Sequence, residues 1–116
     1  MFTKITYKNA KSYVEAQGKL DIYTAPDYLE EVKEHLSRIC TKELVLEFSK
    51  ISFIASIGLR TILELYKIMQ ARNGILRLKN VNESVLYAFS ITGFDNFLII
   101  ENDSESEENL PEEKNP

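Results

Sequence analysis

Ser56 is the residue whose type and position most clearly suggest chemistry in this 116-residue chain. It lies in the segment 51–59 (ISFIASIGL), where an apolar run gives way to a helical pattern. The first N–H groups of a helix have no partner within the helix, so they stabilise a nearby anion. Two interpretations stay open: Ser56 is a simple helix N-cap, or it is a hydroxyl that another protein phosphorylates, which would add about −1.5 to −2 charges.

Other reactive groups are sparse. The chain has one histidine, His35, and one cysteine, Cys40, so an internal disulfide or a zinc site with several cysteines cannot form. We expect His35 to be solvated and Cys40 to be an inert residue rather than a nucleophile. The four glycines are isolated, which excludes a glycine-rich phosphate loop, and the sequence around Ser56 lacks the first glycine of a nucleophile elbow. The sequence therefore predicts no metal, no cofactor and no enzymatic activity.

Alternating strand and helix patterns must position Ser56. Alternation at 2–8 and a short apolar stretch at 13–16 predict two strands, joined as a hairpin by a turn at 8–11. Short apolar runs predict further buried strands, and apolar residues at spacings of three and four predict helices. The expected order is strand 2–8, strand 13–16, helix 25–39, strand 43–48, a connection at 49–54, a helix from 55–58 to 73–74, strand 75–78, helix 82–93 and strand 97–100.

The expected helices have recognisable ends and apolar stripes. Thr24 is expected to cap the first helix, with Pro26 and Asp27 in its first turn, and Asn82 to cap the third, which Gly93 ends. We expect the apolar stripes to pack in the core rather than to contact a ligand. They comprise Leu29, Val32, Leu36 and Ile39; Leu59, Ile62, Leu63, Tyr66 and Met69; and Val85, Leu86 and Phe89.

This succession predicts one α/β domain over residues 1–100, with a mixed, mostly parallel sheet, an N-terminal β-hairpin and packed helices. Helices between short apolar strands imply parallel crossovers. No stretch reaches the ~18 apolar residues that a membrane span needs, and the N-terminus lacks the apolar core of a signal peptide. We therefore expect a cytoplasmic protein that does not insert into membranes.

Charge is distributed unevenly along the chain. The net charge is −4, yet residues 101–116 hold seven acids and one base, which leaves the first 100 residues at +2. A segment so acidic and so poor in apolar residues is expected to be a disordered, solubilising tail. The body carries no basic block, so nucleic acid is not expected as a direct partner.

Two motifs resemble the STAS domain family, and most closely the bacterial anti-sigma factor antagonists, and later segments agree with them. The residues 18–21 (GKLD) and 24–25 (TA) resemble the family's glycine, apolar, aspartate turn before its first long helix. The residues 44–48 (LVLEF) and 53–59 (FIASIGL) resemble its strand and its Asp-Ser-(Ser/Thr)-Gly-Leu signature. The residues 74–76 (GIL), with Leu86 and 91–94 (ITGF), match its next strand and terminal helix, so the resemblance spans roughly residues 2–100.

The resemblance implies a phosphorylation-controlled switch. Ser56 matches the serine that a partner anti-sigma factor serine kinase phosphorylates. The unphosphorylated protein would sequester that kinase and free a sigma factor, and a serine phosphatase would restore the phosphorylated form to this state. Asp21 and Thr24 match positions on the partner-binding surface, and Ala55, Ile57 and Gly58 flank the serine.

Two residues depart from the family pattern, and they keep other interpretations open. The usual aspartate before the serine is Ala55, and the small polar residue after it is Ile57. Ala55 removes a charge and an acceptor next to the hydroxyl. The alternative is a non-phosphorylated STAS adaptor subunit of a transport or signalling complex. A small enzyme on a flavodoxin-like sheet has less support, because the chain offers no acid/base pair.

Overall fold

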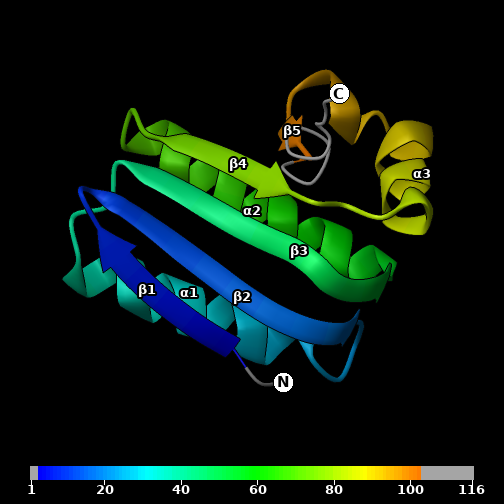
Figure 1. Cartoon of the computed structure of the whole chain (residues 1–116), viewed down its shortest axis with the longest axis horizontal. Coiled ribbons are helices and arrows are strands. Elements are labelled where there is room, and N and C mark those ends of the chain that lie inside the picture. The colour runs from blue at the N-terminus through cyan, green and yellow to red at the C-terminus, as the bar shows by residue number, and fades with distance from the viewer. Residues whose placement is uncertain (1–2, 103–116) are drawn as a thin grey trace, which may run out of the picture.

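The computed structural model describes residues 3–102, in which five strands form one sheet and helices pack against it (Figure 1). The strands lie in sequence order; β1 pairs antiparallel with β2, and every later pair is parallel. The predicted mixed, mostly parallel α/β fold with an N-terminal hairpin is therefore confirmed. The elements are β1 (Thr3–Lys8), β2 (Lys11–Leu20), α1 (Ala25–Arg38), β3 (Glu43–Ile54), α2 (Ser56–Ala71), β4 (Ile75–Lys79), α3 (Glu83–Thr92), the 3₁₀ turn η1 (Phe94–Asn96) and β5 (Ile99–Glu101).

The neighbouring strands β2 and β3 are longer than the sequence predicts. The prediction of a connection at 49–54 is wrong, because these residues extend β3, which pairs with β2 as far as the Leu20–Ile54 register. Ser49 and Lys50 are exposed and polar, so the strand has no apolar signal there, although its backbone still continues the ladder. β2 likewise continues to Leu20 through two register shifts, one of them beside Gly18 at φ +104°.

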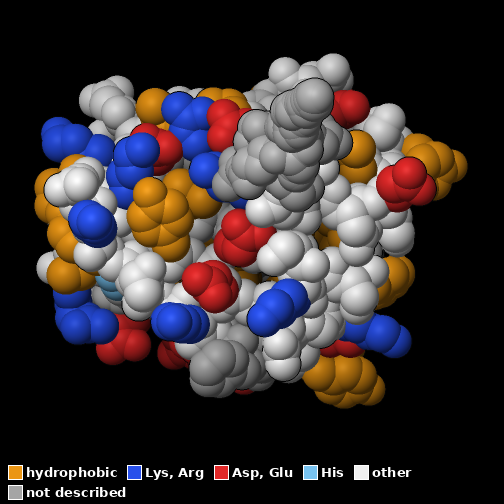
Figure 2. All heavy atoms as spheres, in the orientation of Figure 1, with side chains coloured by type: hydrophobic (Ala, Val, Ile, Leu, Met, Phe, Trp, Pro, Cys, Tyr) orange, Lys and Arg blue, Asp and Glu red, His pale blue; other side chains and the backbone are white. Residues whose placement is uncertain are grey.

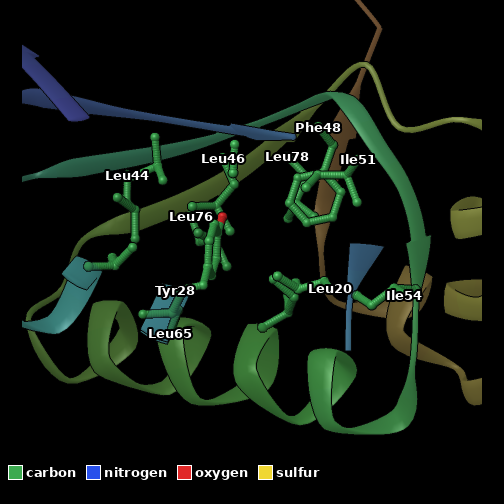
Figure 3. Close-up of a cluster of buried hydrophobic side chains, with 14 of the residues drawn as sticks. Leu20, Tyr28, Leu44, Leu46, Phe48, Ile51, Ile54, Leu65, Leu76 and Leu78 are labelled. Atoms are coloured by element: carbon green, nitrogen blue, oxygen red, sulfur yellow. The ribbon is translucent and has the colours of Figure 1, made fainter. Parts of the chain in front are cut away.

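The core lies between one face of the sheet and the helices α1 and α2 (Figures 1 and 3). On α2 the stripe is shifted from the prediction: Leu65 is fully buried, whereas Leu59, Leu63 and Tyr66 are half-buried. On α3 Val85 and Phe89 are buried as predicted, but Leu86 is 41% exposed, so its placement in the core is wrong. The side chains labelled in Figure 3 are Leu20, Tyr28, Leu44, Leu46, Phe48, Ile51, Ile54, Leu65, Leu76 and Leu78.

The C-terminal part of the fold is fixed by the caps of α3. Asn82 is confirmed as the N-cap, because its Oδ1 accepts from the Val85 N–H at 2.8 Å, and Gly93 ends the helix at φ +82°. β5 begins at Ile99 rather than at 97. Glu101, which the sequence assigned to the acidic tail, is the last residue of β5, and residues 103–116 of that tail lie outside the described residues.

The hydroxyl of Tyr28 is a polar atom buried without a partner. Tyr28 is 1% exposed, and its Oη has no hydrogen-bond partner among residues 3–102. Burial raises the pKa of this phenol far above its usual range. An unpaired buried polar group costs ~1–3 kcal/mol. We expect Tyr28→Phe to raise the free energy of unfolding by ~1 kcal/mol in urea titrations, and a loss of stability would show that the hydroxyl has a partner.

His35 is not the freely solvated side chain that the sequence predicts. It is half-buried, and its Nε2 lies 2.7 Å from the Oγ of Ser12, a serine with no exposed surface. The same Ser12 oxygen lies 2.7 Å from the Oγ1 of Thr41, which is also buried. The prediction fails because sequence periodicity places His35 on α1 but does not show that β2 presents a polar side chain beneath it.

Burial, and then the charge of Arg38, lower the pKa of His35. The unfolded chain therefore takes up the proton at a higher pH than the folded protein. Stability is expected to be complete above the unfolded pKa, about 6.5, and to fall as the pH drops below it. Urea midpoints at several pH values between 8 and 5.5 would measure this decline. His35→Gln, which keeps a hydrogen-bonding group near Ser12, is expected to flatten the decline, and an unchanged profile would contradict the assignment.

Candidate functional site

The ends of β2 and β3 bring two distant segments of the chain together. Leu20 and Ile54 are register partners at the carboxyl ends of these parallel strands. Ala55 follows directly after Ile54, and its N–H donates to the carbonyl of Leu20 at 2.9 Å. The turn that follows β2 and the first residues of α2 therefore lie side by side at the carboxyl edge of the sheet (Figure 1).

The turn from Asp21 to Thr24 is held by hydrogen bonds of its own. The Oγ1 of Thr24 accepts from the Asp21 N–H at 2.9 Å and donates to the Lys19 carbonyl at 2.6 Å. The Oδ1 of Asp21 accepts from the Tyr23 N–H at 3.0 Å. Thr24 occupies the N-cap position of α1 as predicted, but its side chain makes no capping bond to the helix. Asp21 and Thr24 thus fix the shape of this turn before any partner binds.

Gly58 allows α2 to begin directly against β2. A Cβ atom at this position would lie 2.6 Å from the Leu20 carbonyl oxygen and 2.7 Å from Cγ1 of Ile54. Real side chains do not approach backbone this closely, so only glycine fits here. Gly58 is buried, and its role at the site is to position the first turn of α2.

Ser56 is exposed at the start of α2, and its Oγ has no hydrogen-bond partner among residues 3–102. The N-cap residue is Ala55, in an extended conformation, so the interpretation of Ser56 as the N-cap is wrong; Ser56 is the first helical residue. Ala55 cannot cap with its side chain, and the first turn of α2 contains no acidic residue. The free N–H groups therefore leave this end positive, which favours an anion beside Ser56.

Several apolar side chains are exposed on the segments that flank Ser56. The turn after β2 exposes Ile22 (65%) and Tyr23 (85%), and Phe53 near the end of β3 is 45% exposed. A shallow groove of about 180 Å³ runs between the start of α1 and the first turns of α2. Its lining residues are Pro26, Leu29, Ile57, Arg60, Thr61 and Glu64. Exposed aromatic and aliphatic side chains beside a shaped turn are typical of protein interaction surfaces.

The structure thus brings the predicted site residues into one region, although they contribute differently. Ser56 and Asp21 reach its surface, Ile57 lines the groove, and Ala55, Thr24 and Gly58 set the backbone. The sequence patterns did not identify Ile22, Tyr23 or Arg60 as site residues, and Phe53 appeared only within the 53–59 motif. One signal for this surface was available in the sequence. Residues 22–23 are an adjacent apolar pair between a strand and a helix start, and they belong to neither apolar pattern, which indicates exposed apolar side chains.

Residues 3–102 lack two features, a cluster of metal ligands and a helix that could span a membrane. No group of three His, Cys, Asp or Glu side chains in this part of the chain could hold a metal ion. No helix there is long and apolar enough to cross a membrane.

A family model described as "STAS domain" matches residues 4–107, and the chain belongs to this family. The anti-sigma-B factor antagonist of Bacillus subtilis is 29% identical over 97 residues, which cover 79% of this chain and 83% of that protein. A corresponding antagonist of Staphylococcus aureus is 27% identical over 94 residues, 81% of this chain and 86% of that protein.

Solved structures share the fold. A candidate anti-sigma factor antagonist from Thermotoga maritima superposes with a TM-score of 0.82 at 22% identity and covers 93% of both chains. The Bacillus protein SpoIIAA, solved in a phosphorylated form, gives a TM-score of 0.70 at 14% identity, covering 95% of this chain and 100% of that chain. The topology predicted from sequence and the family it resembled are therefore both confirmed.

Proposed function

We propose that this protein is an anti-sigma factor antagonist that binds an anti-sigma factor serine kinase when Ser56 is unphosphorylated. The observation that carries the proposal is the exposed Ser56 hydroxyl, without a partner in residues 3–102, at the uncapped start of α2. Two relatives that align with 79% and 81% of this chain are anti-sigma-B factor antagonists, which supports this class of partner.

The surface beside Ser56 is suited to binding in the unphosphorylated state. Ile22, Tyr23 and Phe53 are exposed, and burying apolar area contributes about 25 cal/mol per Å². The turn after β2 is already ordered by its own hydrogen bonds, so little entropy is lost there on docking. A neutral hydroxyl at the centre of such a contact is inexpensive to bury compared with a charged group.

A phosphate on Ser56 would change docking without disrupting the fold. The free N–H groups of the first turn of α2 can accept a dianion, and Arg60 lies four residues further along the same helix face. The modified protein would stay folded, but any partner covering Ser56 would have to desolvate two negative charges. Phosphorylation would therefore release the kinase, and a serine phosphatase acting on the phosphorylated form would restore binding.

The remaining expectations are part of the same proposal. The domain predicted over residues 1–100, with β5 extending it to Glu101, binds the partners, and the acidic segment that follows lies outside it. The protein acts in the cytoplasm through protein partners, without direct contact with nucleic acid, without insertion into a membrane and without catalysis of its own.

Incubation with a candidate serine kinase and ATP, followed by mass spectrometry of peptides, tests the modification. Phosphate is expected on Ser56 and is expected to vanish in Ser56→Ala. Ser52 provides a matched control, because it is also an exposed serine, located four residues earlier near the end of β3. Ser52→Ala is expected to be phosphorylated normally. Phosphate that persists in Ser56→Ala and disappears in Ser52→Ala would overturn the assignment.

Ala55 favours a second candidate, a non-phosphorylated STAS adaptor subunit of a transport or signalling complex. It supplies neither a charge nor an acceptor beside Ser56. In that case the same apolar surface would hold a constitutive partner. Co-purification with an ATPase or membrane complex, together with no kinase-dependent phosphate on Ser56, would favour this function over the first.

A further inference from the structure

Three connecting segments meet at the amino edge of the sheet, opposite the end that carries Ser56 (Figure 1). They are the β1–β2 turn, the connection from α1 to β3 and the connection from α2 to β4. The Lys42 N–H donates to the Ala10 carbonyl at 2.9 Å, and the Ile75 N–H donates to the Lys42 carbonyl at 3.0 Å. The Tyr7 hydroxyl donates to the Cys40 carbonyl at 3.2 Å. The three segments thus form one surface.

This surface is strongly basic, and we call it the basic edge. Residues 7–11, 38–43 and 70–75 contain five cations and one acid, Glu43, which gives a net charge of +4. Glu43 is half-buried and pairs with Lys11 at 3.8 Å and with Arg77. Figure 2 shows Lys and Arg side chains gathered on the left of the molecule, over this end of the strands. The cations of the basic edge, all exposed, are Lys8, Lys11, Arg38, Lys42 and Arg72.

Few acids lie close enough to neutralise the basic edge. Glu34 lies one helical turn before Arg38. Counting Glu34 as part of the basic edge would lower the net charge of this surface to +3. No ion pair within residues 3–102 involves Lys8, Arg38, Lys42 or Arg72. Like charges brought together without counter-charges repel one another, so this surface would be stabilised by an anionic occupant.

The chain itself carries a suitable polyanion. Residues 103–116 hold six acidic residues against Lys114, a net charge of −5. They follow directly after β5, which is parallel to β4 and ends opposite Lys79, so the tail begins at the carboxyl end of β4, whereas Ile75 in the basic edge lies at its amino end. The five residues of β4 span roughly 17 Å, whereas fourteen residues of extended chain reach ~45 Å. The tail is therefore long enough to lie along the basic edge.

We propose that residues 103–116 bind the basic edge of their own chain through charge–charge contacts. The covalent connection gives the tail an effective concentration in the millimolar range, which a separate acidic peptide would have to exceed. The charges are exposed, so added salt, with a Debye length of ~3 Å at 1 M, releases the tail. The basic edge and Ser56 lie at opposite ends of β3, so the docked tail leaves the Ser56 surface free.

Cys40 allows a direct test, because it is the only cysteine of the chain, is exposed and lies within the basic edge. A nitroxide spin label on Cys40 of the full chain broadens the NMR signals of nearby amides. At low salt we expect the amide signals of residues 103–116 to lose at least half their intensity, and to recover it in 1 M NaCl. Tail signals that keep full intensity at low salt would overturn the proposal.

Three controls test whether the basic edge is the binding site and whether the tail of the same chain occupies it. The triple variant Lys8→Glu, Lys42→Glu, Arg72→Glu is expected to restore the tail signals at low salt. Arg60→Glu, a charge reversal of an exposed residue at the other end of α2, is expected to leave them broadened. Mixing spin-labelled chains with isotope-labelled chains that carry no spin label tests binding between copies. Broadening of equal size in that mixture would show that the occupant is the tail of a second copy and would overturn the intramolecular proposal.

Discussion

Ser56→Glu is expected to weaken binding of the anti-sigma factor kinase at least a hundredfold, which corresponds to ~3 kcal/mol. The added carboxylate would lie within the proposed contact, at the start of α2, beside the segments that expose Ile22, Tyr23 and Phe53. A partner covering this region would have to remove water from the charge, and an uncompensated buried charge costs several kcal/mol. Titration calorimetry with the purified kinase measures the dissociation constants of the protein and the variant.

Three companion measurements make this expectation specific. Ser56→Ala is expected to bind with nearly unchanged affinity, because the neutral hydroxyl has no partner within residues 3–102 to lose. Ser52→Glu adds the same charge to an exposed position near the end of β3 and is expected to weaken binding much less. Thermal unfolding of all variants should agree closely, because α2 tolerates an anion at its start. Equal affinity of Ser56→Glu and Ser56→Ala would contradict the switch and favour the adaptor.

Gly58→Ala is expected to lower the free energy of unfolding by about 2 kcal/mol, although the same exchange in an ordinary helix is stabilising by ~1 kcal/mol. The new Cβ would collide with the Leu20 carbonyl oxygen at 2.6 Å and with Ile54 at 2.7 Å. Neither neighbour can move easily, because one is backbone and the other side chain is buried. Overpacking of this kind costs ~1–3 kcal/mol, and the backbone contact places it at the upper end.

The collision should also affect the site. To relieve it, α2 has to move away from the end of β2, which lengthens the bond from the Ala55 N–H to the Leu20 carbonyl. We therefore expect slower phosphorylation of Ser56 at temperatures where Gly58→Ala is fully folded. Urea unfolding and phosphorylation rates measure the two effects, with Lys67→Ala, an exposed position on the same helix, as a control expected within ±0.5 kcal/mol. A Gly58→Ala variant as stable as the unchanged protein would show that the contact is not rigid.

Some of the residues that lay on periodic patterns could be assigned to the core from sequence. Val85 and Phe89 on α3, and the cap at Asn82, follow from spacing and side-chain type, and the structure agrees. The second half of β3 could not be found, because Ser49 and Lys50 interrupt the apolar run and only pairing with β2 keeps this segment extended. Long-range pairing of this kind has no signature in a single sequence.

In the candidate site, too, some features followed from the sequence and others only from the fold. The position of Ser56 at a helix start followed from the sequence, and Asp21 and Thr24 followed from the family resemblance. Their adjacency depends on the Leu20–Ile54 register, which only the fold defines. The sequence also suggested Ser56 as the cap, because serine is a common cap; the structure shifts the helix by one residue and makes Ala55 the cap. Helix ends are set by such small differences in backbone angles, which composition does not encode.

The meeting of two distant loops at the ends of β2 and β3 also ties recognition to the completion of folding. Asp21 and Ser56 become neighbours only after α1 has formed and a parallel crossover has closed, a step that has to offset the entropy of a long loop. A newly synthesised or partly denatured chain presents the same serine in the same local sequence, yet it lacks the surface that a partner would contact. A kinase that reads this surface would respond to the number of mature molecules in the cell rather than to the total amount of chain.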